Sequence, residues 1–194
     1  MTFLRPNVSS DLGTTITGEG VFLRTPQITD FSAWAALRAR SRDFLTPWEP
    51  IWPSDDLTRG AFRRRIRRYR AEMRDDQTYP FFIFRMSGGA LVGGLTLSNV
   101  TRGMTQTATI GYWMGEPYAG KGHMTAALKA LLPYAFGTLR LHRLEAACLP
   151  HNRASIRLLE KCGFRREGLA RGLVCIAGRW QDHILFARLA EDRP

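Results

Sequence analysis

A glycine-rich loop in the middle of the chain has residue types that can hold a phosphate group. Gly120 and Gly122 flank Lys121 between a predicted strand and a predicted helix. Without Cβ atoms the backbone can approach an anion closely, and the first N–H groups of a helix are unpaired donors. The spacing excludes a P-loop, and it excludes the dinucleotide-binding pattern because Thr125 stands where the third glycine would be. On its own, such a loop is more often a tight strand–helix turn than a phosphate site.

A second polar cluster opens a predicted helix further along the chain. Asn152 can cap this helix, Ser155 lies in its first turn, and Gly163 is a suitable residue at its end. A capping role and a functional role both remain open for Asn152. Ser155 is likewise either an ordinary first-turn serine or a hydrogen-bond donor.

The elements that position these residues alternate between helical and extended periodicity. We predict strands over residues 21–23, 81–86, 90–97, 107–114, 144–149, 172–176 and 180–189. We predict helices over residues 30–42, 122–136 and 152–162, and an arginine-rich helix that is capped by Ser54, as Asp30 caps the first one. Residues 1–18 are predicted to be a flexible N-terminal arm. Residues 19–194 are predicted to form a single mixed α/β domain.

The chain is strongly basic. Lys and Arg total 28 against 17 Asp and Glu, which gives a net charge of +11. Six arginines crowd into residues 63–70 on a predicted amphipathic helix, whose apolar stripe is Phe62, Ile66, Tyr69 and Met73. The basic face of this Arg63–Arg70 helix is either a solvated surface or a site for an acidic or RNA partner.

The composition excludes several classes of protein. Hydrophobic residues make up 44% of the chain, which is enough for a sizeable core. The 3 cysteines contain no C-x-x-C pair, so neither a disulfide framework nor a zinc site is expected. No apolar stretch approaches the length of a membrane span, and the first residues lack the apolar core of a signal peptide. We expect a cytoplasmic protein with no metal and no membrane partner.

Taken together, these motifs resemble the GNAT superfamily of acyl-CoA N-acyltransferases. The order is strand, G-x-G loop, helix, strand, and then the pattern N-x-x-x-x-x-L-x-E-K-x-G-F over residues 152–164. The resemblance covers residues 20–190. It is closest to the RimJ/RimL-type ribosomal-protein alanine N-acetyltransferases, and within them to RimJ. Segments outside the general motif support this, namely residues 43–50, 97–103, 110–112 and 178–183.

The resemblance implies a fold and a mode of cofactor binding. The GNAT fold is a twisted mixed sheet of about seven strands flanked by about four helices, and the sheet is splayed at the acyl-CoA site. Acetyl-CoA would be the co-substrate. The residues implied in its binding are Tyr112, Trp113 and Met114 along the pantetheine arm, the N–H groups of Gly120, Lys121, Gly122, His123 and Met124 around the pyrophosphate, and Asn152.

Two departures from the family pattern affect the site. Pro117 stands where the family loop usually carries Gln or Arg, so one side-chain contact to phosphate would be lost. Leu159 stands where many members have the Tyr that protonates the departing thiolate. Ser155 lies one turn earlier on the same helix face, and the RimJ/RimL group uses a serine here. Ser155 is therefore our candidate acid.

The general base is less well defined by the sequence. An α-amine has a pKa near 8, so a moderate base suffices, directly or through a water molecule. Glu116 lies beside the predicted splay, and Glu49 lies in a loop bracketed by two prolines. Glu49 could instead contact the cationic N-terminus of the substrate. Glu145, on the opposite strand, is a third candidate.

These residues lead to one expected function and two alternatives. The expected function is transfer of acetyl to the N-terminal α-amine of a protein with Ala or Ser first, such as a ribosomal protein, by direct attack on the thioester. One alternative is an enzyme that acetylates a polyamine, an aminoglycoside or an amino acid. The other is a non-catalytic module that binds RNA or the ribosome. The chain is expected to be a monomer or a homodimer.

Overall fold

One twisted sheet lies between two layers of helices. Alternate side chains of its central strands point to opposite faces, so both faces are covered. The computed structural model describes residues 14–192. The strands are β1 (Thr15–Gly18), β2 (Val21–Arg24), β3 (Tyr79–Arg85), β4 (Leu91–Thr101), β5 (Thr107–Met114), β6 (Arg143–Cys148), β7 (Arg165–Ile176) and β8 (Arg179–Leu189). The helices are α1 (Phe31–Arg40), α2 (Arg42–Leu45), α3 (Arg59–Arg74), α4 (His123–Pro133) and α5 (Arg153–Lys161).

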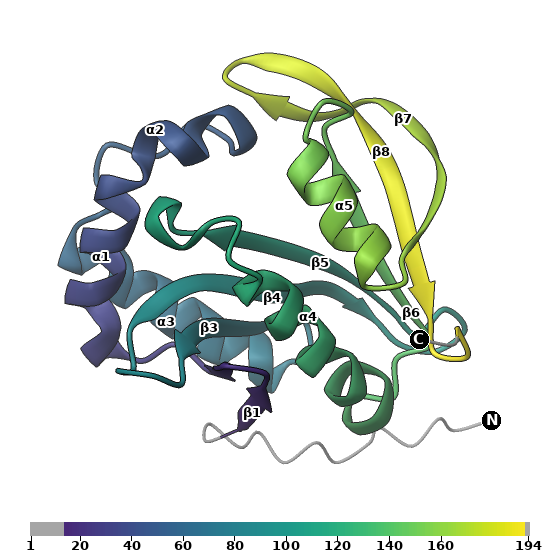
Figure 1. Ribbon diagram of the computed structural model, residues 1–194, viewed down its shortest axis with the longest axis horizontal. Coiled ribbons are helices and arrows are strands. Elements are labelled where there is room, and N and C mark those ends of the chain that lie inside the picture. The colour runs from purple at the N-terminus through teal and green to yellow at the C-terminus, as the bar shows by residue number, and fades with distance from the viewer. Residues whose placement is uncertain (1–13, 193–194) are drawn as a thin grey trace.

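The strand order is β1-β2-β3-β4-β5-β6-β8-β7 (Figure 1). Neighbouring strands are antiparallel except β5 and β6, which are parallel. The β5–β6 register contains only the pairs Thr107–Arg143, Ala108–Leu144 and Thr109–Glu145. Both strands continue beyond the last pair, so they diverge there. The mixed sheet and its splay are therefore confirmed.

Helices cover the two faces of the sheet. On β3, Phe81 and Ile83 pack in the larger core with α4, whereas Phe82 and Phe84 pack in a second core with α1 and α3. Because successive strand residues point to opposite faces, α3 and α4 lie on opposite sides of the sheet. In Figure 1, α3 lies behind β3 and α4 lies in front.

Several predicted boundaries were wrong. Residues 15–18 form strand β1 against β2, so they are not part of a flexible arm, and the sheet has eight strands. The rest of the predicted arm, residues 1–13, lies outside the described residues. The helix predicted over residues 30–42 ends at Arg40, and a separate short helix, α2, follows it. Helix α4 ends at Pro133 and is followed by a π turn over Tyr134–Thr138.

Two predicted helix caps are corrected. The cap of α3 is Thr58, whose hydroxyl accepts a hydrogen bond from the N–H of Ala61 at 3.2 Å, and not Ser54. The helix begins later than predicted because two turns precede it. In these turns the N–H of Asp56 donates to the carbonyl of Pro53, and the N–H of Thr58 donates to the carbonyl of Asp55. Asp30 directly precedes α1, but its carboxylate does not cap that helix. It instead binds the Arg24 guanidinium and the N–H of Gln27.

Candidate active site

The divergence of β5 from β6 brings together two hydroxyl groups from distant parts of the chain. The Tyr112 hydroxyl on β5 lies 2.5 Å from Oγ of Ser155 in the first turn of α5. Ser155 is buried, with 9% of its surface exposed. Burial raises the pKa of Tyr112, an effect that the Ser155 hydroxyl opposes. The phenol is therefore protonated at neutral pH and can donate to Ser155.

A thiol completes this cluster. Burial raises the pKa of Cys148 at the end of β6, and the Ser155 hydroxyl beside it lowers that pKa. The net shift is upward, so the thiol is protonated at neutral pH. Cys148, Cys162 and Cys175 are all free cysteines.

Asn152 acts as the cap of α5. Its side-chain oxygen accepts a hydrogen bond from the N–H of Ser155 at 3.1 Å. This bond fixes the first turn of α5 and with it the position of Ser155. The capping role left open by the sequence is thus present, and a contact to acetyl-CoA remains a prediction for the amide group.

The glycine loop has the backbone conformation expected of an anion site. Gly120 and Gly122 have φ of 71° and 81°, a left-handed conformation that L side chains rarely adopt. A Cβ at either position would meet no atom within 4 Å, so open space lies over the loop. Gly122 precedes α4, and no side chain caps that helix end. The loop N–H groups and the exposed Lys121 can therefore face a bound phosphate.

His123 and Met124 begin helix α4. Met124 is buried in the larger core, so only its backbone is available to a ligand. His123 is partly exposed. Desolvation lowers the pKa of His123, as do the nearby charges of Arg85 and Lys121. The ring is therefore neutral at physiological pH.

Glu116 is an accessible carboxylate next to the divergence. Its backbone N–H donates to Oγ of the buried Ser41 at 2.9 Å, which ties the start of the loop to the α1–α2 junction. A Cβ on Gly115 would come within 2.3 Å of Leu37, so this close approach requires glycine. The Glu116 side chain is exposed, and within residues 14–192 its carboxylate has neither a hydrogen bond nor an ion pair.

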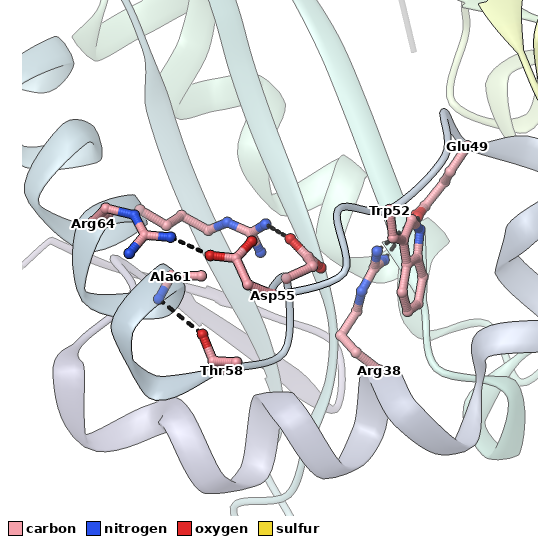
Figure 2. A network of polar contacts seen from close by, with 9 residues as sticks. Arg38, Glu49, Trp52, Asp55, Thr58, Ala61 and Arg64 are labelled. Carbon is pink, nitrogen blue, oxygen red and sulfur yellow. Dashed lines mark hydrogen bonds and ion pairs between the residues drawn. The ribbon is translucent and has the colours of Figure 1, made fainter.

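Glu49, in contrast, is held in a network (Figure 2). Its two oxygens accept from the Arg38 guanidinium at 2.8 and 2.7 Å and from the Trp52 indole at 2.7 Å. Arg38 lies 4.0 Å from the Trp52 ring and 5.0 Å from the Trp113 ring on β5. Three donors thus occupy the Glu49 carboxylate. Glu145 is paired with Arg143 at 2.9 Å, so of the three candidate bases Glu116 is the unengaged one.

The residues that position Trp113 were not identified from the sequence. A Cβ on Gly94 would come 2.4 Å from the Trp113 indole nitrogen, and one on Gly93 would come 2.5 Å from the Trp113 carbonyl oxygen. The glycine pair on β4 therefore lets β5 and its indole approach closely. Two glycines inside a strand are a sequence signal for such an approach. No comparable signal marks Arg38 or Ser41.

A large cleft opens at the loop between β6 and α5, the loop that precedes Ser155. Its volume is about 820 Å³. The walls come from the α2 region and the tip of the β7–β8 hairpin, which face each other in Figure 1, and the floor is the β6–α5 loop. The lining residues are Arg42, Asp43, Thr46, Pro47, Leu149, His151, Ile176, Ala177, Arg179 and Gln181.

Comparison with known proteins identifies the family. A model of the acetyltransferase (GNAT) domain matches residues 21–165. The chain belongs to the GNAT acetyltransferases. A probable N-acetyltransferase of Bacillus subtilis, YjcK, is 39% identical, over 90% of this chain and 97% of the relative. The ribosomal protein uS5-alanine N-acetyltransferase of Escherichia coli is 33% identical, over 85% of this chain and 86% of the relative.

Solved GNAT structures agree with the fold. RimJ of Mycobacterium smegmatis, in complex with CoA-disulfide, has a TM-score of 0.86 and 35% identity, and the match covers 93% of this GNAT chain and 88% of that one. The ribosomal-protein-S5-alanine acetyltransferase of Vibrio fischeri has a TM-score of 0.86 and 28% identity, with 93% and 100% covered. This GNAT protein is therefore an N-acetyltransferase similar to RimJ/RimL enzymes.

Two kinds of feature are absent from residues 14–192. No helix there is long and apolar enough to cross a membrane. In the same range, no group of three or more His, Cys, Asp or Glu side chains is arranged to hold a metal ion.

Proposed function

We propose that the enzyme transfers the acetyl group of acetyl-CoA to the N-terminal α-amine of a protein with Ala or Ser first, specifically a ribosomal protein. The observation that carries this proposal is the hydrogen bond from Tyr112, on β5 beyond its last pair with β6, to Ser155 on α5. An open cleft lies at the loop that precedes Ser155. The activity in the name of the E. coli relative supports the acceptor, and the CoA-containing RimJ structure supports the donor.

In this proposal acetyl-CoA enters the gap between β5 and β6. The backbone of Tyr112, Trp113 and Met114, which lies beyond the last pair with β6, binds the pantetheine arm. The N–H groups from Gly120 to Met124 surround the pyrophosphate, with the positive end of α4 and the Lys121 charge in support. The thioester then lies next to the Ser155 hydroxyl.

The chemistry needs no covalent enzyme intermediate. The neutral amine attacks the thioester carbon, and a backbone N–H of the Tyr112–Met114 stretch stabilises the oxyanion. The C–S bond then breaks, and Ser155 donates its proton to the thiolate. The protonated phenol of Tyr112 donates to Ser155 in turn, so it can replace that proton. Cys148 is protonated and is not required as a nucleophile.

The free carboxylate of Glu116 serves as the base that accepts the proton of the amine, through a water molecule.

The cleft receives the acceptor, since an open volume of about 820 Å³ accommodates several residues of an extended peptide. The basic helix α3 associates with the ribosome or another acidic partner. A ribosomal acceptor places the enzyme in the cytoplasm.

Intact-mass measurement with a panel of acceptors tests the proposal. The panel contains peptides that begin with Ala, Ser or Met, the same peptides N-blocked but containing Lys, and several polyamines and aminoglycosides. We expect acetyl addition only on free Ala or Ser N-termini. Transfer to the small amines alone, or to Lys of the blocked peptides, would contradict the proposed acceptor. Failure to bind acetyl-CoA, read by thermal shift, would contradict the proposed donor.

A further inference from the structure

Seven of the eight arginines of helix α3 fall into two groups according to their partners, and the eighth, Arg59, lies over the Phe31 ring. Arg64 pairs with Asp55, Arg65 with Asp56, and Arg68 with Glu72. Figure 2 shows how the segment before α3 brings Asp55 to Arg64, next to the Thr58 cap. Within residues 14–192 four other arginines of α3 are exposed and have no hydrogen bond, ion pair or ring contact: Arg63, Arg67, Arg70 and Arg74.

These four unpaired arginines form one line on the helix, which we call the arginine stripe. Their spacing of four, three and four residues places them on one face. At a rise of 1.5 Å per residue, the stripe is about 16 Å long. Glu72 lies on nearly the opposite side of the helix, so no acid of α3 interrupts the stripe.

The stripe lies far from the acetyl-transfer chemistry in the fold. Phe62 and Ile66 pack α3 against the face of the sheet that carries α1. The glycine loop opens α4, which packs against the other face. The stripe is therefore not a second contact to the phosphates of acetyl-CoA. None of its residues lines the large cleft either.

The stripe has the chemistry of a phosphate-binding surface. Guanidinium groups bind phosphate oxygens in a bidentate manner, and a row of them matches a polyanionic backbone. Protein interfaces instead need an apolar centre. The large exposed hydrophobic side chains of the described residues all lie outside α3, for example Ile28, Ile51, Met104 and Trp180. The stripe therefore offers charge without an apolar anchor.

We propose that the stripe of Arg63, Arg67, Arg70 and Arg74 binds the phosphate backbone of RNA. RNA is favoured over DNA because the proposed acceptor is a ribosomal protein, so this choice rests on the proposed function. The stripe would hold the enzyme on an RNA surface while the opposite side of the sheet carries out acetyl transfer.

The test compares two double variants that remove the same net charge from the same helix. Arg67→Gln/Arg70→Gln removes half of the stripe, whereas Arg64→Gln/Arg68→Gln removes two exposed arginines that already have acidic partners. Gln is a good helix former, and circular dichroism verifies that both variants are folded. Binding is measured by fluorescence anisotropy with a labelled RNA hairpin over a series of salt concentrations.

The stripe variant should lose about 1.5 from the slope of log K against log salt, because each phosphate contact contributes roughly 0.7 to 0.9. Its affinity for the RNA hairpin at low salt should fall by about tenfold. The paired-arginine variant should lose less than half as much of the salt-dependence slope and should keep an affinity closer to that of the wild type. Equal losses in the two variants would overturn the stripe. So would an absence of RNA binding by the wild type at low salt.

Two further probes decide the class of partner. Polyglutamate that binds as tightly as RNA would overturn the proposal in favour of an acidic protein, and a DNA hairpin that binds more tightly than RNA would overturn the choice of RNA. Acetylation of an Ala-first peptide is measured in parallel. The stripe variant should retain wild-type kcat/KM, so loss of RNA binding and failure of the proposed acetyl transfer are read separately.

Discussion

The hydroxyl of Ser155 lies where three parts of the chain meet. Tyr112 reaches it from β5, Cys148 lies beside it at the end of β6, and Asn152 holds its backbone N–H. An ordinary first-turn serine would be exposed, whereas this one is 9% exposed. At the residue scale, this convergence is the reason to assign Ser155 the acid role.

Replacing Ser155 with Ala should lower kcat by about 100-fold, as expected when a general acid is removed. The KM for acetyl-CoA should change little, because the contacts proposed for the cofactor come from the backbone. Steady-state kinetics on an Ala-first peptide measure both constants. Tyr112→Phe keeps the serine and should cost less, about tenfold. Wild-type kcat in Ser155→Ala would contradict the assignment.

Glu116 and Glu49 should respond differently to substitution. Glu116→Gln should reduce kcat at neutral pH without lowering the thermal stability, because its carboxylate has no partner within the described residues. Glu49→Ala leaves Arg38 without its ion pair, and Arg38 is only 7% exposed. The free energy of unfolding of the Glu49→Ala variant should therefore fall by about 3 kcal/mol. Kinetics and thermal melts measure the two effects. A loss of kcat without a loss of stability in Glu49→Ala, and a loss of stability in Glu116→Gln, would exchange the roles of base and structural ion-pair partner.

At the scale of elements, much of the site could be predicted because its signals are local. The glycine loop, the Asn152 cap and the strand before them are each encoded within a few residues. The Arg38–Glu49–Trp52 network could not be predicted, because it joins α1 to a loop that has no periodic pattern. The beginning of α3 was misplaced because several residues before it could act as a cap.

The position of the α3 cap is testable with matched variants. Thr58→Ala should lower the free energy of unfolding by about 1 kcal/mol, since it removes the hydrogen bond to the N–H of Ala61. Ser54→Ala should have almost no effect. Denaturant unfolding of the two variants measures the difference, and a larger effect at Ser54 would restore the earlier helix start.

The glycine loop can be tested with a control from another loop. Gly122→Ala forces a side chain into a left-handed conformation, with φ of 81°, and should weaken acetyl-CoA binding by about tenfold as the loop shifts. Gly103 has φ of 76° and equally open surroundings. Gly103→Ala should cost similar stability, about 1 kcal/mol, with no effect on binding. Titration calorimetry that finds equal binding losses would contradict the phosphate role.

At the scale of the whole molecule, the sheet separates two kinds of chemistry. One face carries the glycine loop and α5, and the other carries the arginine stripe. The net charge of +11 adds a general attraction for anions, which salt should screen. The order of the strands in the sheet could be inferred only through the family resemblance, because no local pattern specifies that β6 pairs with β8.

The buried thiols and phenols predict how stability depends on pH. Burial raises the pKa of Cys148, Cys162, Tyr112 and Tyr134 in the folded state. The folded chain therefore stays protonated while the unfolded chain ionises. The contribution to stability is complete below about pH 9, the ordinary thiol value, and is lost as the pH rises above it. Melting temperatures across the alkaline range should fall, and less steeply in Tyr112→Phe.

The most direct test of the account is to locate the transferred acetyl group. A peptide that begins with Ala and contains an internal Lys is incubated with acetyl-CoA and the enzyme, and its product is fragmented in a mass spectrometer. We predict that the added acetyl group is on the α-amine, that none is on the lysine, and that the Ser155→Ala variant forms the same product far more slowly. Acetylation of the lysine side chain, or no acetylation of the peptide alongside transfer to a small amine, would contradict the account.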